Sequence, residues 1–156
     1  MSREREVYTR RDTLRLRGFD YTSRRIYFIT IVVSRRRRLF LDQRLARATI
    51  ACLRDLRQKM GFAVYCYCLM PDHFHALIGT GESHKSLGQI VGAFKSLSTR
   101  RHWQWYEGQL WQRQYFDHII RNDKDLEETW EYVILNPVRK GLVASPAEWP
   151  FTGRLD

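Results

Sequence analysis

The chain has 156 residues, and its 27 lysines and arginines outnumber its 17 acidic residues, giving a net charge of +10. This length suggests one domain, and the charge favours nucleic acid or an anionic membrane surface as a partner. The membrane alternative is disfavoured because the longest apolar run, residues 26–33, is far shorter than a membrane-spanning helix. No signal peptide is visible either, so we expect a cytoplasmic protein that associates with the nucleoid when bound to DNA.

Seven elements are expected in chain order: a strand at 24–33, a helix at 42–60, strands at 62–70 and 73–80, a helix at 87–101, a strand at 115–121 and a helix from about 122 to 136. Asp42 and the Ser86–Gln89 pair are N-terminal helix caps, and Gly61 is a stop signal. We expect Pro137 and Gly141 to end the last helix.

The strand at 62–70 is apolar on both faces, which predicts a central position in the sheet. Its Cys66 and Cys68, and Cys52 before it, are expected to be reduced, because an odd number of cysteines without a CxxC pair disfavours a disulfide framework. The order βαββαβα is typical of the α+β, ferredoxin-like class, with an antiparallel sheet of four to five strands and helices packed on one face. We therefore predict one domain over residues 1–156, with residues 1–20 as a flexible arm.

His73 and His75 are two residues apart on a predicted strand, so their side chains point to the same face. Two imidazoles placed in this way can coordinate one metal ion. Two histidines on a half-buried strand remain the alternative, because the motif is short.

Tyr132 and Asn136 are four residues apart on the last predicted helix and therefore share a face. A phenol beside a metal ion is a potential nucleophile, and an amide oxygen suits Mg²⁺ or Mn²⁺. The alternative is a tyrosine that only packs its ring. Tyr115 and His118 are secondary candidates, as a phenol near the metal and a proton carrier, although both also fit ordinary sheet positions.

Basic residues that could contact phosphate occur throughout the chain, with the densest run at the proposed edge of the sheet. They are Arg35, Arg36, Arg37, Arg38, Lys95, Arg101, Arg113, Arg139 and Lys140. Aromatic residues interleave with cations between 101 and 113, a pattern that suits stacking of unpaired bases. Trp111 and Trp149 are expected instead to cap the hydrophobic core.

Two stretches resemble one known family. LMPDHFHALI (residues 69–78) resembles the His-hydrophobic-His motif of single-tyrosine (HUH) transposases, and residues 111–143, with the NPVRKG segment, resemble the C-terminal half of the REP-associated tyrosine transposases. Weaker similarity extends from about residue 17 to residue 151.

The resemblance implies a role for each matching residue: His73 and His75 as metal ligands, Asn136 as a third polar ligand, and Tyr132 as the nucleophile that forms a 5′-phosphotyrosine bond. It also implies a divalent cofactor, Mg²⁺ or Mn²⁺, and as substrate the single-stranded or hairpin DNA of repetitive extragenic palindromes. A monomer is favoured, with a dimer as the alternative.

Three functions follow from these observations. The first is an endonuclease and strand-transferase that uses Tyr132, and the intact motifs favour it. The second is a regulator that binds DNA hairpins without cutting them. The third is a metal-dependent phosphodiesterase that uses activated water and forms no covalent adduct.

Overall fold

The computed structural model describes residues 25–155, so the proposed arm at 1–20 lies outside the described residues. The strands are β1 (Ile26–Val32), β2 (Ala63–Met70), β3 (His73–Gly79), β4 (Phe116–Ile119) and β5 (Thr152–Leu155). The α-helices are α2 (Gln43–Met60), α3 (Leu87–His102), α4 (Asp123–Ile134) and the short α5 (Asn136–Arg139). Short 3₁₀ turns are η2 (Ser34–Arg36), η3 (Leu39–Leu41) and η4 (Pro146–Glu148).

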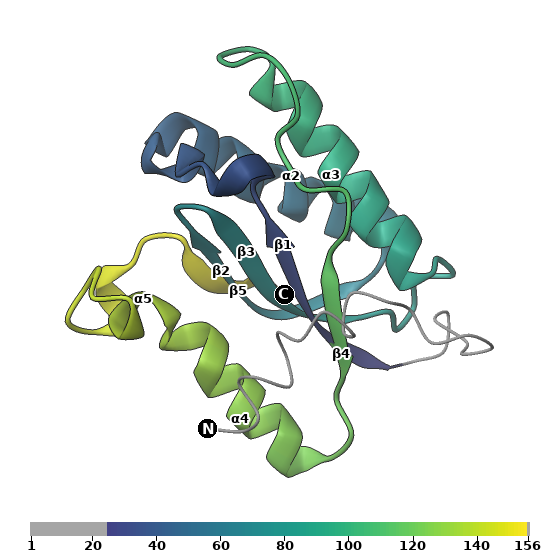
Figure 1. Cartoon of the computed structure of the whole chain (residues 1–156). Coiled ribbons are helices and arrows are strands. Elements are labelled where there is room, and N and C mark those ends of the chain that lie inside the picture. The colour runs from purple at the N-terminus through teal and green to yellow at the C-terminus, as the bar shows by residue number, and fades with distance from the viewer. Residues whose placement is uncertain (1–24, 156) are drawn as a thin grey trace.

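The strands form one sheet in the order β4-β1-β3-β2-β5, and every pair is antiparallel (Figure 1). β3 is the middle strand and is hydrogen-bonded to β1 on one side and β2 on the other. β5 was not predicted, because its four residues, TGRL, carry no β-branched or aromatic run that would mark a strand. The α+β class, the βαββαβα order and the antiparallel sheet are confirmed.

Helices cover both faces of the sheet, which corrects the expectation of helices on one face. Strand residues such as Ile29 and Phe74 point into a core shared with α2 and α3. Residues of opposite parity, including Phe28 and Leu77, point into a second, smaller core against Val133 of α4. Figure 1 shows α4 on the side of the sheet away from α2 and α3. The predicted histidine pair belongs to the α4 face, since its strand parity matches that of Leu77.

The predicted helix boundaries have clear local causes. The Asp42 side chain accepts a hydrogen bond from the Arg44 backbone, and Gly61 ends α2 at φ 77°, a left-handed conformation that suits glycine. Ser86 and Gln89 form both halves of a capping box at the start of α3. The last predicted helix is instead divided at Leu135, and Pro137 belongs to the first turn of α5 instead of ending a helix.

The buried residues agree with several expectations. Trp111 is buried in the larger core, Trp149 packs partly against both cores, and the three cysteines are free and buried. Within residues 25–155, no helix is both long and apolar enough to cross a membrane.

Candidate active site

His73 and His75 project from β3 toward α4, with their ring centroids 4.5 Å apart. Their shared direction follows from the alternation of side chains along a strand. His75 is 1% exposed and stacks on Phe28 of the neighbouring strand, with centroids 5.3 Å apart. His73, at the start of β3, is 9% exposed. The pair therefore has one deep ring and one ring near the surface.

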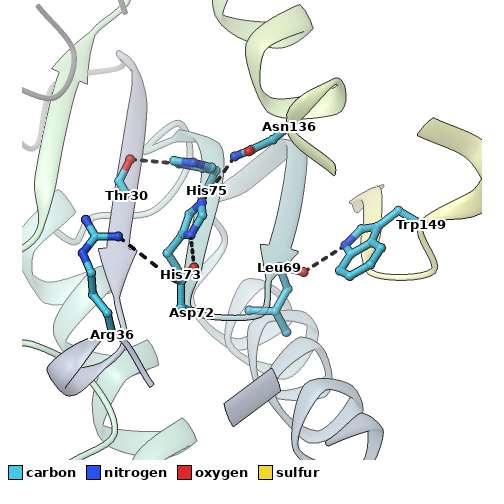
Figure 2. Close-up of polar contacts among 8 residues, drawn as sticks. All are labelled: Thr30, Arg36, Leu69, Asp72, His73, His75, Asn136 and Trp149. Atoms are coloured by element: carbon cyan, nitrogen blue, oxygen red, sulfur yellow. Dashed lines mark hydrogen bonds and ion pairs between the residues drawn. The ribbon is translucent and has the colours of Figure 1, made fainter. Parts of the chain in front are cut away.

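Each histidine is oriented through its Nδ1 atom (Figure 2). His73 Nδ1 lies 2.6 Å from Asp72 Oδ1, and His75 Nδ1 lies 2.9 Å from Thr30 Oγ1, its register partner on β1. A carboxylate only accepts hydrogen bonds, so His73 donates from Nδ1 and its lone pair is on Nε2. Such partners fix the tautomer and ring orientation of metal-binding histidines. Any metal bond would accordingly be made through Nε2.

Asn136 completes the group from the first residue of α5. Its side chain is 1% exposed, and its Nδ2 lies 3.3 Å from His73 Nε2. Its Oδ1 is buried and has no hydrogen-bond partner within the described residues. A buried amide oxygen without a partner is costly, so a ligand that this oxygen can bind would relieve the cost.

The protonation states suit metal binding. Burial lowers the pKa of His75 well below its usual value, and the nearby positive charge of Arg139 lowers it further. His75 is thereby kept neutral, as a metal ligand must be. The hydrogen bond from His73 lowers the pKa of Asp72 against the opposing effect of burial, so Asp72 stays ionised and orients the His73 ring.

Tyr132 of α4 lies over this pair. Its ring centroid is 5.7 Å from that of His75 and 5.9 Å from that of Phe28, both in edge-to-face contact. The Arg139 guanidinium lies 4.0 Å from the Tyr132 ring centroid and donates a 2.6 Å hydrogen bond to the Tyr132 backbone carbonyl. The phenol is thus held between the histidines and a cation.

These residues fit a divalent metal ion. The two imidazoles and the partnerless Asn136 Oδ1 converge from β3 and α5, and nitrogen and oxygen donors of this kind bind first-row divalent ions. No cluster of three His, Cys, Asp or Glu residues that could hold a metal ion occurs in the part of the chain that the structure describes, and the amide of Asn136 is not among these residue types.

The arginine run lies at the end of inner strand β1, not at an edge of the sheet as expected. All four arginines are exposed, and Arg35 and Arg36 have positive φ angles of 58° and 52°. Arg36 forms an ion pair with Asp72 (Figure 2), with 3.7 Å between Arg36 Nη1 and Asp72 Oδ2, so the arginine run contacts the residue that orients His73. Lys140 is exposed beside Arg139.

Other predicted residues have partners away from the histidines. Lys95 is half-buried and donates to the carbonyls of Gln112 and Arg113, whereas Arg101 pairs with Asp55 of α2 at 2.9 Å. Arg113 itself is exposed. Both secondary candidates have structural contacts as well.

Tyr115 packs against the larger core, on the α2 and α3 side. His118 Nε2 lies 3.0 Å from Asp125 Oδ2, at the start of α4. Asp125 is fully buried and also accepts from the Arg121 backbone. This pair ties the helix that carries Tyr132 to β4.

Sequence reasoning did not identify Thr30 or Asp72 as orienting residues. Thr30 could not be found by spacing, because it lies 45 residues from His75 and meets it only through the β1–β3 register. Asp72 directly precedes His73, and a carboxylate beside a candidate ligand histidine was an available signal.

Residues 22–135 match the family model described as "Transposase IS200 like", a range that includes the histidine pair and Tyr132. The chain belongs to this family. The IS200-like match ends one residue before Asn136.

Two curated relatives carry a more specific name. The chain is 27% identical to the REP-associated tyrosine transposase of Escherichia coli K12, covering 81% of this chain and 74% of the relative. It is 28% identical to a Haemophilus influenzae protein provisionally given the same name, over 85% of this chain and 81% of the relative. The resemblance stated from the sequence is confirmed, and so is the class of enzyme, a transposase with a tyrosine nucleophile.

A solved structure supports the fold. A REP-associated tyrosine transposase bound to a REP hairpin matches 89% of this chain and 82% of its own, with a TM-score of 0.74 and 23% identity. The likeness confirms the five-stranded antiparallel architecture of this IS200-like transposase.

Proposed function

We propose that this transposase cuts single-stranded or hairpin-bearing DNA through attack by Tyr132 on a phosphodiester, next to a divalent metal ion bound by His73, His75 and Asn136. The observation that carries the proposal is the convergence of these four side chains from β3, α4 and α5. His73, His75 and Asn136 are each no more than 9% exposed to solvent. The site can therefore exclude water around a bound phosphate.

The proposed step balances as a transesterification. The Tyr132 Oη atom forms a bond to phosphorus, the bond from phosphorus to the 3′ oxygen breaks, and the products are a 5′-phosphotyrosine ester and a 3′ hydroxyl. The phenol proton passes to solvent, and the departing 3′ oxygen takes up a proton. Because one phosphoester replaces another, the 3′ hydroxyl of a strand can later reverse the step and release the tyrosine.

The residues around Tyr132 have separate tasks in this proposal. Asp72 and Thr30 hold the two imidazoles in fixed orientations, and Arg139 holds the tyrosine ring and adds a positive charge near the reacting oxygen. A divalent ion held by the three donors would act as a Lewis acid toward the scissile phosphate. Mg²⁺ and Mn²⁺ suit this mixture of nitrogen and oxygen donors.

The DNA partner is inferred from relatives and charge. The solved relative is bound to a REP hairpin, and this chain carries a net charge of +10 with exposed arginines beside the site. We extend the hairpin substrate to this chain, and we propose that it acts as a monomer, since all four site residues come from one chain. Binding should weaken as salt rises, because phosphate contacts release counterions.

The test is a denaturing gel of the protein incubated with labelled hairpin-bearing single strands and Mn²⁺. We expect a covalent protein–DNA adduct with the wild type and none with Tyr132→Phe. Tyr115→Phe is the matched control, because Tyr115 packs against the opposite core and should leave the adduct intact.

The other outcomes identify the other functions. Strand cutting that survives Tyr132→Phe without an adduct would replace the proposal with a nuclease that uses water. If the protein binds hairpins tightly but cuts no hairpin-bearing sequence from the genome that encodes it, a regulator that binds without cutting would be favoured.

A further inference from the structure

A shallow cavity, largely open to solvent and outside the histidine site, lies between α3 and the segment that follows it. Its volume is about 370 Å³, which falls within the range of small-ligand pockets. The described side chains that line it include Lys95, Thr99, Arg100, Trp103, Gln109 and Trp111. It therefore combines aromatic surface with cationic and hydrogen-bonding groups.

Trp103 forms a wall of the cavity and is 57% exposed, although tryptophan is usually largely buried. Its ring is nevertheless fixed, because Nε1 donates a 2.8 Å hydrogen bond to the Gly108 carbonyl. Gly108 has a φ of 94°, a conformation that other residues rarely adopt. An exposed and preoriented indole of this kind is a platform for stacking and contributes little to the core.

The charge of the cavity favours an anionic ligand. Arg100 is exposed and has no ion pair within residues 25–155, and Lys95 directs its ammonium group at the Gln112 and Arg113 carbonyls next to the cavity. No acidic residue is among the described side chains that line the cavity. An aromatic face beside an available guanidinium suits a nucleotide, whose base stacks and whose phosphate pairs with the cation.

The other aromatic residues of this segment are already engaged. Trp111 is 3% exposed and donates to Ser98 Oγ, so it forms the floor of the cavity. The Tyr106 hydroxyl donates to Asp42, and Trp105 packs against the larger core. Trp103 is the aromatic side chain that remains available for a base.

The cavity lies next to the arginine run, which follows β1 and also contacts the histidine site on the other face of the sheet. Arg37 donates a 2.8 Å hydrogen bond to the Gln109 carbonyl, and the backbones of Ser34 and Leu110 are also hydrogen-bonded. Arg36, in the same run, pairs with the Asp72 that orients His73. A strand held at the histidines can thus pass the arginines and reach the α3 side of the sheet.

We propose that this cavity is a second nucleic-acid subsite, in which Trp103 stacks on an unpaired base of the bound single strand and Arg100 binds an adjacent phosphate. The subsite rests on the proposed DNA function and adds the place where an unpaired nucleotide away from the scissile phosphate is held. Stacking on an indole tolerates any base, so the subsite supplies affinity more than sequence choice.

The first test uses the full chain with Tyr132→Phe as background, so that binding is measured without covalent trapping. The probes are a labelled oligothymidylate of about 16 nucleotides and its fully abasic counterpart. Trp103→Leu should weaken binding of the base-bearing probe by about 5- to 160-fold and leave the abasic probe unchanged. Trp103→Phe keeps an aromatic face and should restore most of the preference.

A second measurement tests the cation. Arg100→Gln should reduce the slope of log affinity against log salt by about 0.7, the value for one phosphate contact on a single strand. Lys59→Gln is the charge-matched control, because Lys59 is exposed in the last turn of α2.

An equal preference for bases in the Trp103→Leu protein and the wild type would overturn the subsite, as would a wild type that binds both probes equally. These results are distinguishable from failure of the proposed function. That function is judged by the adduct gel, in which the wild type is compared with Tyr132→Phe and Tyr115→Phe.

Discussion

The Thr30 hydroxyl provides a direct test of how His75 is held. Thr30→Val removes the hydrogen bond to His75 Nδ1, 2.9 Å long, while it keeps the shape of a side chain that is 2% exposed. Loss of one buried hydrogen bond costs about 0.5–1.5 kcal/mol. We expect the lower half of this range, because the Ile29 backbone also hydrogen-bonds the His75 imidazole.

The effect on metal binding should be larger than the effect on stability. Loss of a residue that orients a ligand histidine lowers metal affinity by about 10- to 100-fold. We expect about tenfold for Thr30→Val, since the Ile29 contact keeps part of the orientation. Urea denaturation measures the first quantity, and titration with Mn²⁺ followed by calorimetry measures the second.

Thr30→Ser is the matched control, because it keeps the hydroxyl and loses only a methyl group, worth about 0.8 kcal/mol when buried. It should therefore lose a similar amount of stability but keep its Mn²⁺ affinity, whereas the valine variant should lose Mn²⁺ affinity as well. Equal Mn²⁺ affinities for wild type and Thr30→Val would refute the role given to this hydrogen bond.

Three further predictions concern the same structure. Asn136→Leu should lower Mn²⁺ affinity and adduct yield with little change in stability, because removal of a buried oxygen without a partner in the described residues offsets the lost hydrogen bond from Nδ2 to His73. Calorimetry and the gel check this, and an unchanged metal affinity would remove Asn136 from the ligand set. His118→Leu leaves the buried Asp125 carboxylate without its imidazole partner, so it should lower the free energy of unfolding by about 1–3 kcal/mol. Urea denaturation measures this, and an unchanged midpoint would contradict the anchoring of α4 to β4. Burial raises the pKa of Cys66 to about 12 and that of Cys68 to about 11. Both thiols should therefore resist iodoacetamide in native protein at pH 8 but react quickly in unfolded protein. Rapid labelling of the native protein would show that the smaller core is open to the reagent.

Much of the fold could be predicted from local patterns. The apolar run around Ile29, the capping box at Ser86 and the stop at Gly61 each depend on neighbours within four residues, and each is found as expected. β5 could not be predicted, since its residues become a strand only through pairing with β2, more than 80 residues earlier in the chain. The placement of α4 on the second face likewise depends on packing of Val133 against that sheet face.

The candidate site was predictable to a smaller extent. The spacing of His73 and His75 showed that they share a face, but spacing could not single out Tyr132 among eight tyrosines. The break at Leu135 also changed the geometry that was expected for Asn136. Tyr132 and Asn136 occupy separate helices instead of one continuous face, and their approach to the histidines depends on the turn between them.

The position of β3 in the sheet has a consequence for the order in which parts of the molecule open. Amides of a strand that is paired on both sides exchange with solvent only through large openings, whereas α4 contacts the sheet from one side. Hydrogen–deuterium exchange should be slowest at residues 74–78 and clearly faster along α4. The tyrosine helix could then detach and return repeatedly while the two histidines keep their backbone geometry, so a strand joined to Tyr132 could be carried away from the metal ligands and brought back.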